Sequence, residues 1–99
     1  MTESTHAVLA TFAMDLARES EQREALLGFI VPGVRSAPGF VSGHWTLDRA
    51  TSESVALVAF ESEESARAFA GSVRGNAEHQ QALGITLVSA RVVEVTARA

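Results

Sequence analysis

The 99-residue chain contains no cysteine, no lysine and no tyrosine. Without cysteine it can form no disulfide, thiol nucleophile or cysteine-ligated metal cluster. Without lysine it can form neither a Schiff base with a substrate or pyridoxal phosphate nor a Walker A phosphate site. Without tyrosine it has no phenolic acid. Proton transfer is therefore left to His6, His44, His79 and the carboxylates.

Positive charge and long apolar runs are also scarce. The net charge of -4 argues against nucleic acid or an anionic membrane surface as a partner. No stretch approaches the roughly 20 apolar residues that span a bilayer. The polar start, Met1–Thr5, lacks the basic and apolar regions of a secretory signal. We therefore expect a cytoplasmic protein that binds neither nucleic acid nor membrane.

What the chain does contain is apolar surface, with 46% hydrophobic and 20% charged residues. This composition is typical of one globular domain, which we place at residues 1–99 with an ordered core of about 6–96. Its strongest feature is Ser54–Phe60, which is apolar at every position after the serine. As a strand, this segment is apolar on both sides and needs cover on both.

Three further strands are predicted from alternating side chains, at His6–Ala13, Phe40–Asp48 and Ile85–Thr96. The alternation in the last one falters at Val92-Val93, where a β-bulge would restore it. These strands, with Ser54–Phe60, predict a four-stranded sheet.

Two helices are predicted between the strands. The first has Ser20 as its N-cap, bends at Pro32 and ends at Ala37–Gly39. The second begins after Ser62, and a short helical turn follows from Asn76 to Leu83. Helical spacing predicts a buried stripe on the first helix, formed by Leu26, Leu27, Ile30, Val31 and Val34.

The order strand–helix–strand, repeated once, is typical of the ferredoxin-like α+β fold, βαββαβ. Right-handed crossovers place both helices on one face of an antiparallel sheet. The other face is left uncovered although its strands are apolar on both sides, and monomers rarely expose so large an apolar surface. We therefore expect a homodimer formed by sheet-to-sheet packing.

Three segments resemble a known family. They are Pro32–Trp45, Val58–Ala66 and Asn76–Gln80. In these segments the chain is similar to the antibiotic biosynthesis monooxygenase-like proteins of the dimeric α+β barrel superfamily. The resemblance implies a barrel closed by two sheets at a dimer interface, with a pocket in each subunit between sheet and helices. Relatives include cofactor-independent oxygenases of aromatic polyketides, haem-degrading enzymes and proteins without an assigned reaction.

The candidate catalytic residues are His79 and His44. His79 matches the histidine that many relatives carry after the second helix, and an imidazole titrates near neutral pH; alternatively it is a solvated residue on a polar turn. His44 and Trp45 point to opposite sides of their strand, so one should line the pocket and the other the dimer face. Trp45 could hold an aromatic ligand or fill the core, and the same alternatives apply to Phe12.

Asn76 and Arg35 are the remaining candidates for substrate binding. Asn76 could orient a substrate carbonyl, although a role as helix N-cap would also explain it. Arg35 could meet an anionic group or pair with a surface carboxylate. The histidines lie far apart and show no metal-ligand spacing, so we expect no metal and no cofactor. A haem site is disfavoured because the partners it would need are not recognisable.

Two functions remain open. The first is a cofactor-independent monooxygenase of a small aromatic or polyketide-type molecule, in which His79 or His44 deprotonates a phenol and the resulting anion reduces oxygen. The second is a non-catalytic ligand-binding or interaction dimer with the same fold. The absence of a dense polar cluster in the sequence favours the second.

Overall fold

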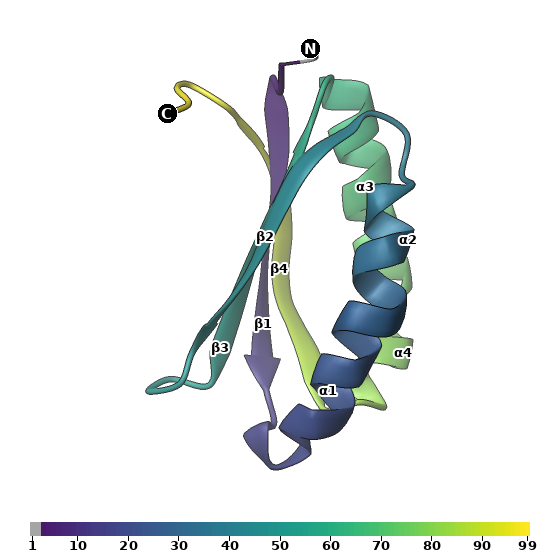
Figure 1. The fold of residues 1–99 in the computed structure, drawn as a ribbon, viewed down its shortest axis with the longest axis vertical. Coiled ribbons are helices and arrows are strands. Elements are labelled where there is room, and N and C mark those ends of the chain that lie inside the picture. The colour runs from purple at the N-terminus through teal and green to yellow at the C-terminus, as the bar shows by residue number, and fades with distance from the viewer. Residues whose placement is uncertain (1–2) are drawn as a thin grey trace.

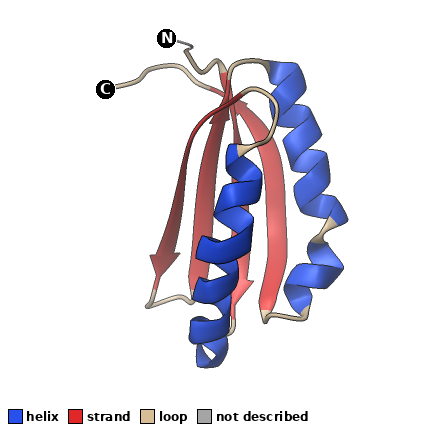
Figure 2. Cartoon of the chain, turned by 45° about the vertical axis from the view of Figure 1, so that its right-hand side comes forward, coloured by secondary structure: helices blue, strands red, loops and turns tan. Residues whose placement is uncertain are grey.

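The computed structural model describes residues 3–99 as a single antiparallel sheet with helices over one face (Figure 1). The strands are β1 (His6–Met14), β2 (Phe40–Asp48), β3 (Glu53–Phe60) and β4 (Ile85–Glu94), in the spatial order β2-β3-β1-β4. Figure 2 shows two helical columns side by side on the same face of the sheet. The predicted ferredoxin-like α+β subunit is confirmed.

The first helical column begins earlier than predicted. It consists of the 3-10 turn η1 (Leu16–Arg18), α1 (Glu19–Ala25), the π-helical turn η2 (Leu26–Ile30) and α2 (Val31–Arg35). Asp15 is the N-cap, since its carboxylate accepts the N–H of Ala17 at 3.1 Å. The prediction of Ser20 as N-cap is wrong, because the preceding connection is itself helical and an earlier acidic cap was available.

The bend expected at Pro32 takes the form of the π-helical turn η2 just before it. Proline has no N–H to donate, and its ring crowds the carbonyl of Gly28, four residues earlier. A wider turn relieves this crowding, and the N–H of Val31 instead reaches the carbonyl of Leu26. The column therefore continues through the proline as far as Arg35.

The second helical column follows the prediction closely. It comprises α3 (Glu63–Gly75) and the short α4 (Ala77–Gln81). The hydroxyl of Ser62 accepts the N–H of Ser65 at 3.1 Å and caps α3. The guanidinium of Arg67 donates to Glu63 at 2.9 Å across one helical turn.

The core lies between the helices and one face of the sheet. Val8, Val58 and Phe60 are fully buried and pack against residues of both helical columns, including Val34 and Ala66. The ring of Phe60 forms aromatic pairs with those of Phe40 and Phe69. The turn from α2 into β2 brings Gly39 close to α3. Its φ is +79°, and a Cβ at Gly39 would lie 2.8 Å from that of Ser65.

Within residues 3–99, the opposite face of the sheet carries no helix. Cross-strand partners share a face, so the register places Leu57 beside Leu9 on one side and His44 on the other. Val55 and Ala59 flank Leu57 on the same face of β3. The centre of this open face, over β1 and β3, is therefore apolar. Leu57 is 44% exposed.

The predicted bulge at Val92-Val93 is wrong. The register of β4 shifts instead between the pairs Thr11–Ser89 and Phe12–Leu87, which leaves Val88 as the extra residue. Val92 packs into the helix-side core, whereas Val93 pairs with Ala7 on the open face. The side chains of the two valines thus point to opposite faces, as in a regular strand. Both are apolar because β4 is apolar on both faces here.

The two ends of the chain are hydrogen-bonded to each other at one end of the sheet. The N–H of Thr5 donates to the carbonyl of Phe60 at 3.0 Å, and the N–H of Val95 donates to the carbonyl of Thr5 at 2.9 Å. Arg98 forms an ion pair with Glu3 at 3.1 Å. Among residues 3–99, no helix is both long enough and apolar enough to cross a membrane.

Candidate functional site

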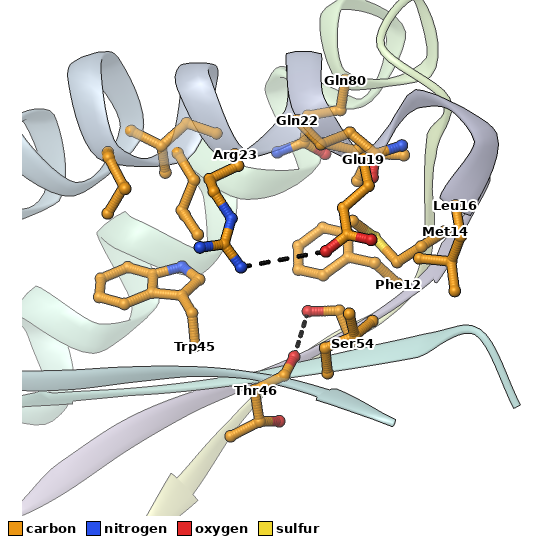
Figure 3. A pocket seen from close by; sticks show the side chains of 15 residues that line it. Phe12, Met14, Leu16, Glu19, Gln22, Arg23, Trp45, Thr46, Ser54 and Gln80 are labelled. Carbon is orange, nitrogen blue, oxygen red and sulfur yellow. Dashed lines mark hydrogen bonds and ion pairs between the residues drawn. The ribbon is translucent and has the colours of Figure 1, made fainter. Parts of the chain in front are cut away.

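A pocket of about 350 Å³ lies between the first helical column and the sheet (Figure 3). Its roof is formed by residues of α1 and η2, and its floor by residues of β1, β2 and β3. Gln80 of α4 and Ile85 of β4 also line it. The lining is mostly apolar, as in the pockets that proteins use for small organic molecules.

Two aromatic side chains line this pocket. Trp45 and Phe12 lie on the helix side of the sheet, where both pack against the cluster that contains the small residues Ala10 and Ala56. Both rings are only partly buried, and both line the pocket. Of the pair His44 and Trp45, the structure therefore places Trp45 in the pocket (Figure 3).

The apolar stripe of the first helical column forms the roof of the pocket. Leu26 and Ile30 are only half-buried, and Leu27 is 64% exposed. All three line the pocket. The prediction that the whole stripe is buried is therefore wrong at Leu27, because a cavity and not a packed core lies beneath this part of the helix.

A buried glutamine holds one end of the pocket together. Gln22 is 5% exposed, and its Nε2 donates to the carbonyl of Asp15 at 2.8 Å and to that of Leu83 at 3.0 Å. These bonds join the start of the first helical column to the turn before β4. Gly84 in this turn has a φ of +75°, and a Cβ there would lie 3.0 Å from the side chain of Asp15. Gln22 and Gly84 thus tie the start of the first helical column to the turn before β4 at this end of the pocket.

A second glutamine has an unsatisfied atom. Gln80 lines the pocket, and its Oε1 is buried without a hydrogen-bond partner among residues 3–99. A buried acceptor that makes no hydrogen bond costs about 1–3 kcal/mol. This atom has essentially no accessible surface, so it adds no hydrogen-bonding group to the wall of the pocket.

Charged side chains complete the pocket lining. Both carboxylate oxygens of Glu19 accept hydrogen bonds from Arg49 of the β2–β3 loop, at 2.9 and 2.7 Å. Arg23 reaches Glu19 only at 3.9 Å, and its side chain is 69% exposed (Figure 3). The hydrogen bond from Arg49 holds the pKa of Glu19 below its ordinary value, and the charges of Arg49 and Arg23 add to this effect.

The pair Glu19–Arg49 gives a prediction for the Arg49→Gln variant. Loss of the guanidinium should raise the pKa of Glu19 toward the ordinary value for glutamate, about 4.3. In the wild type, the folded-state pKa lies below the unfolded one. The contribution of Glu19 to stability is therefore present above the unfolded pKa and is lost as the pH falls through the folded pKa. The NMR titration of the Glu19 carboxyl measures the shift.

The matched control is Arg67→Gln. Arg67 holds the pKa of Glu63 low by the same kind of hydrogen bond, on the other helical column. Each variant should raise the pKa of its own partner and leave the other carboxyl unchanged. An unchanged Glu19 titration in Arg49→Gln would contradict the pairing.

The two candidate histidines do not line the pocket. His44 is exposed on the open face of β2, opposite Leu57. His79 is exposed on α4, one residue before Gln80. Their assignment as general bases stays a prediction, without support from the geometry of the pocket.

Asn76 and Arg35 also lie outside the pocket lining. The side chain of Asn76 does not cap α4; its Nδ2 donates to the carbonyl of Ser72 at 3.1 Å and so closes the end of α3. Arg35 is exposed in the last turn of α2. Residues 3–99 hold no group of three or more histidine, aspartate and glutamate side chains arranged to bind a metal.

The polar residues of the pocket are not among the residues predicted from the sequence, although a signal for some of them is present. Glu19, Gln22 and Arg23 precede Leu26 and Ile30 at helical spacing, and all five line the pocket. They continue the apolar stripe toward the N-terminus. Gln80 gave no comparable signal.

Neither a protein-family model nor a curated protein sequence matches this chain. Several solved structures are similar to this chain. One is a monooxygenase from the gene ActVA-Orf6 of Streptomyces coelicolor, in complex with the ligand Nanaomycin D. It is 25% identical with a TM-score of 0.63, and the match covers 97% of this chain and 89% of that one.

Two further structures are described as putative antibiotic biosynthesis monooxygenases. The one from Deinococcus radiodurans is 11% identical with a TM-score of 0.66, covering 95% of this chain and 93% of its own. The one from Chloroflexus aurantiacus J-10-fl is 20% identical with a TM-score of 0.63, covering 97% of each chain. The resemblance to the antibiotic biosynthesis monooxygenase-like proteins of the dimeric α+β barrel superfamily is thus confirmed at the level of the fold, and this chain has their ferredoxin-like subunit.

Proposed function

We propose that the chain is a monooxygenase of the antibiotic biosynthesis type that acts on a small aromatic or polyketide-type molecule. The observation that carries this proposal is the apolar pocket of about 350 Å³ with Trp45 and Phe12 in its lining. Flat aromatic side chains favour stacked or edge-on contact with a planar ligand. The similar Streptomyces coelicolor monooxygenase, which was solved with Nanaomycin D, supports the same class of ligand.

The proposed reaction needs no electron donor besides the substrate. The phenol of the substrate, or its keto tautomer with a CH₂ group in the ring, loses a proton, and the resulting anion reduces O₂. The CH₂ group becomes a carbonyl that keeps one oxygen atom, and the other oxygen atom leaves as water with both hydrogens. The pocket would hold the ring in place and exclude water from the anion.

One observation favours the alternative, a non-catalytic ligand-binding protein. Among the described residues, the pocket lining contains no histidine and one carboxylate, Glu19, which is held by Arg49. A carboxylate whose pKa is lowered is a weak base for a phenol. In this reading the pocket binds the ligand, and the chemistry is left to another protein.

We further propose that two copies pair through the open faces of their sheets. The apolar centre of this face, which includes Leu9 and Leu57, has no cover within residues 3–99. Polar residues such as His44 and Arg91 lie at its two edges. An apolar centre with a polar rim is the usual anatomy of a protein interface, and a twofold copy supplies a matching surface.

Oxygen uptake in the presence of hydroxylated anthrones and naphthols tests the proposed function. The wild type should bind these compounds, consume oxygen and release quinones. Trp45→Leu should weaken their binding roughly tenfold, because a large aromatic contact is lost. Phe29→Leu is the matched control, since Phe29 is 75% exposed and lies outside the pocket lining.

The outcomes separate the two functions. Binding without oxygen uptake across the whole panel would favour the ligand-binding alternative. Oxygen uptake that is lost in His44→Gln or His79→Gln would support a base outside the pocket. Failure of folded wild-type protein to bind any of the compounds would exclude both functions for this class of ligand.

A further inference from the structure

Gly43 lies next to Trp45 on the helix side of β2. One residue separates the two positions, so both face the same side of the sheet. A Cβ placed on Gly43 would lie 3.0 Å from Cζ3 and 3.1 Å from Cη2 of Trp45, which form the far edge of the six-membered ring. In Figure 3 this ring points away from Phe12 and Glu19. The indole of Trp45 therefore lies over the backbone of Gly43.

The backbone at Gly43 does not itself require glycine. Among residues 3–99, the glycines with a positive φ are Gly39 and Gly84, whereas Gly43 lies within the extended strand β2. A glycine inside a strand weakens it, because it has no side chain to pack and loses more conformational freedom on folding. It often marks the close approach of another group, and here that group is the indole.

The space over Gly43 keeps part of the indole out of the pocket. On the sheet, the indole packs against the core clusters that contain Val58 and Ala56, the cross-strand partners of Gly43 and Trp45. The pocket of about 350 Å³ also borders the indole. Carbon atoms in optimal contact are about 3.5–4.0 Å apart, so a side chain at position 43 would displace the ring. Because the core is closely packed, the ring would move into the pocket.

We propose that Gly43 is a positioning residue that determines how long a planar ligand the pocket accepts. In Figure 3, Trp45 lies at one end of the pocket, and Met14 and Leu16 lie at the other. A larger residue at position 43 moves the Trp45 end inward and excludes long ligands first. This inference rests on the proposed function, because it assumes that the pocket binds aromatic molecules, and it adds what limits their length.

The position of the indole can be measured directly, because Trp45 is the one tryptophan of the chain and tyrosine is absent. Gly43→Val should shift the fluorescence emission of the folded protein to longer wavelength and increase its quenching by acrylamide, because the ring moves into a pocket that is open to solvent. Gly43→Ala should cause a smaller shift in the same direction. Gly71→Ala is the matched control, since a Cβ at Gly71 would meet nothing within 4 Å.

Binding of two probes tests the consequence for ligands. The probes are 2-naphthol and 2-hydroxyanthracene, which differ by one fused ring, and equilibrium dialysis without oxygen measures their affinities. The wild type should bind both. Gly43→Val should weaken binding of 2-hydroxyanthracene by roughly tenfold or more, and that of 2-naphthol by at most about twofold. In the double variant, Trp45→Phe should reverse most of this loss, because the smaller ring leaves space for the valine.

Unchanged emission of Gly43→Val, or an equal loss of both probes, would overturn the inference and leave the proposed aromatic pocket standing. Tighter binding of 2-hydroxyanthracene would place the displaced ring outside the pocket and would also overturn it. If the folded wild type binds neither probe, the aromatic pocket is wrong, and the inference fails with it. Circular dichroism checks that each variant is folded, and valine suits a strand. Should Gly43→Val not fold, Gly43→Ala gives the same comparison with one added methyl group.

Discussion

Phe60→Ala is expected to lower the free energy of unfolding by about 3–5 kcal/mol, the usual cost of removing a buried phenylalanine ring. Phe60 has no exposed surface and lies in the core cluster with Val8, Val58 and Ala66. Its ring contacts that of Phe40 edge-on, with centroids 6.5 Å apart, and that of Phe69 at 5.2 Å. The substitution therefore opens a cavity and also removes two aromatic contacts.

Urea denaturation measures this loss as a lower midpoint with an unchanged slope. All proteins are compared at one concentration, because dimerisation adds to the apparent stability. Phe29→Ala is the matched control, since the side chain of Phe29 is 75% exposed and its loss should change little. Equal effects of the two substitutions would show that Phe60 does not anchor the core. The expected loss is a large part of the free energy of unfolding of a typical domain, which is about 5–15 kcal/mol.

Leu57→Arg should convert the proposed dimer into a monomer. Leu57 lies at the centre of the open face, beside Leu9, and is 44% exposed in the single chain. In the proposed dimer this position is buried, and a charged side chain buried without a partner costs about 3–5 kcal/mol. The dissociation constant of the dimer should therefore rise by a factor on the order of 100 or more. Because Leu57 is partly exposed in the subunit, the fold itself should survive.

Sedimentation at micromolar concentration distinguishes the two states. The wild type should sediment as a dimer and Leu57→Arg as a folded monomer. Phe29→Arg, which places the same charge on the helical side, should remain dimeric. A wild type that sediments as a stable single chain would refute the dimer, whereas a dimeric Leu57→Arg variant would place the interface on another surface.

The fold could be predicted from the sequence because the order strand–helix–strand occurs twice and the strands are apolar on both faces. Few folds other than the ferredoxin-like fold combine these two features. Ser54–Phe60 is apolar on both sides, and in the structure Phe60 packs under the helices whereas Leu57 lies on the open face. The same property caused the error at Val92 and Val93. In a strand that is apolar on both faces, two neighbouring valines do not reveal a bulge, and the actual bulge at Val88 depends on pairing with β1.

The aromatic part of the pocket could be predicted, but its polar part could not. Trp45 and Phe12 were candidates by residue type. An N-cap at Ser20 would leave Glu19 outside the helix. Instead, Asp15 starts the helical column four residues before Glu19, and Glu19 therefore lies over the sheet. On a helix, adjacent residues differ in direction by about 100°, so the orientation of α4 alone decides that Gln80 and not His79 lines the pocket.

The position of the two chain ends has a practical consequence. Thr5 lies between Phe60 and Val95, and Figures 1 and 2 show both ends of the chain at the end of the sheet remote from η1. Met14 and Leu16, at the other end, line the pocket. A fluorescent reporter, an immobilisation handle or a covalent linker between two copies can thus be attached at either end of the chain without obstructing access for a small molecule.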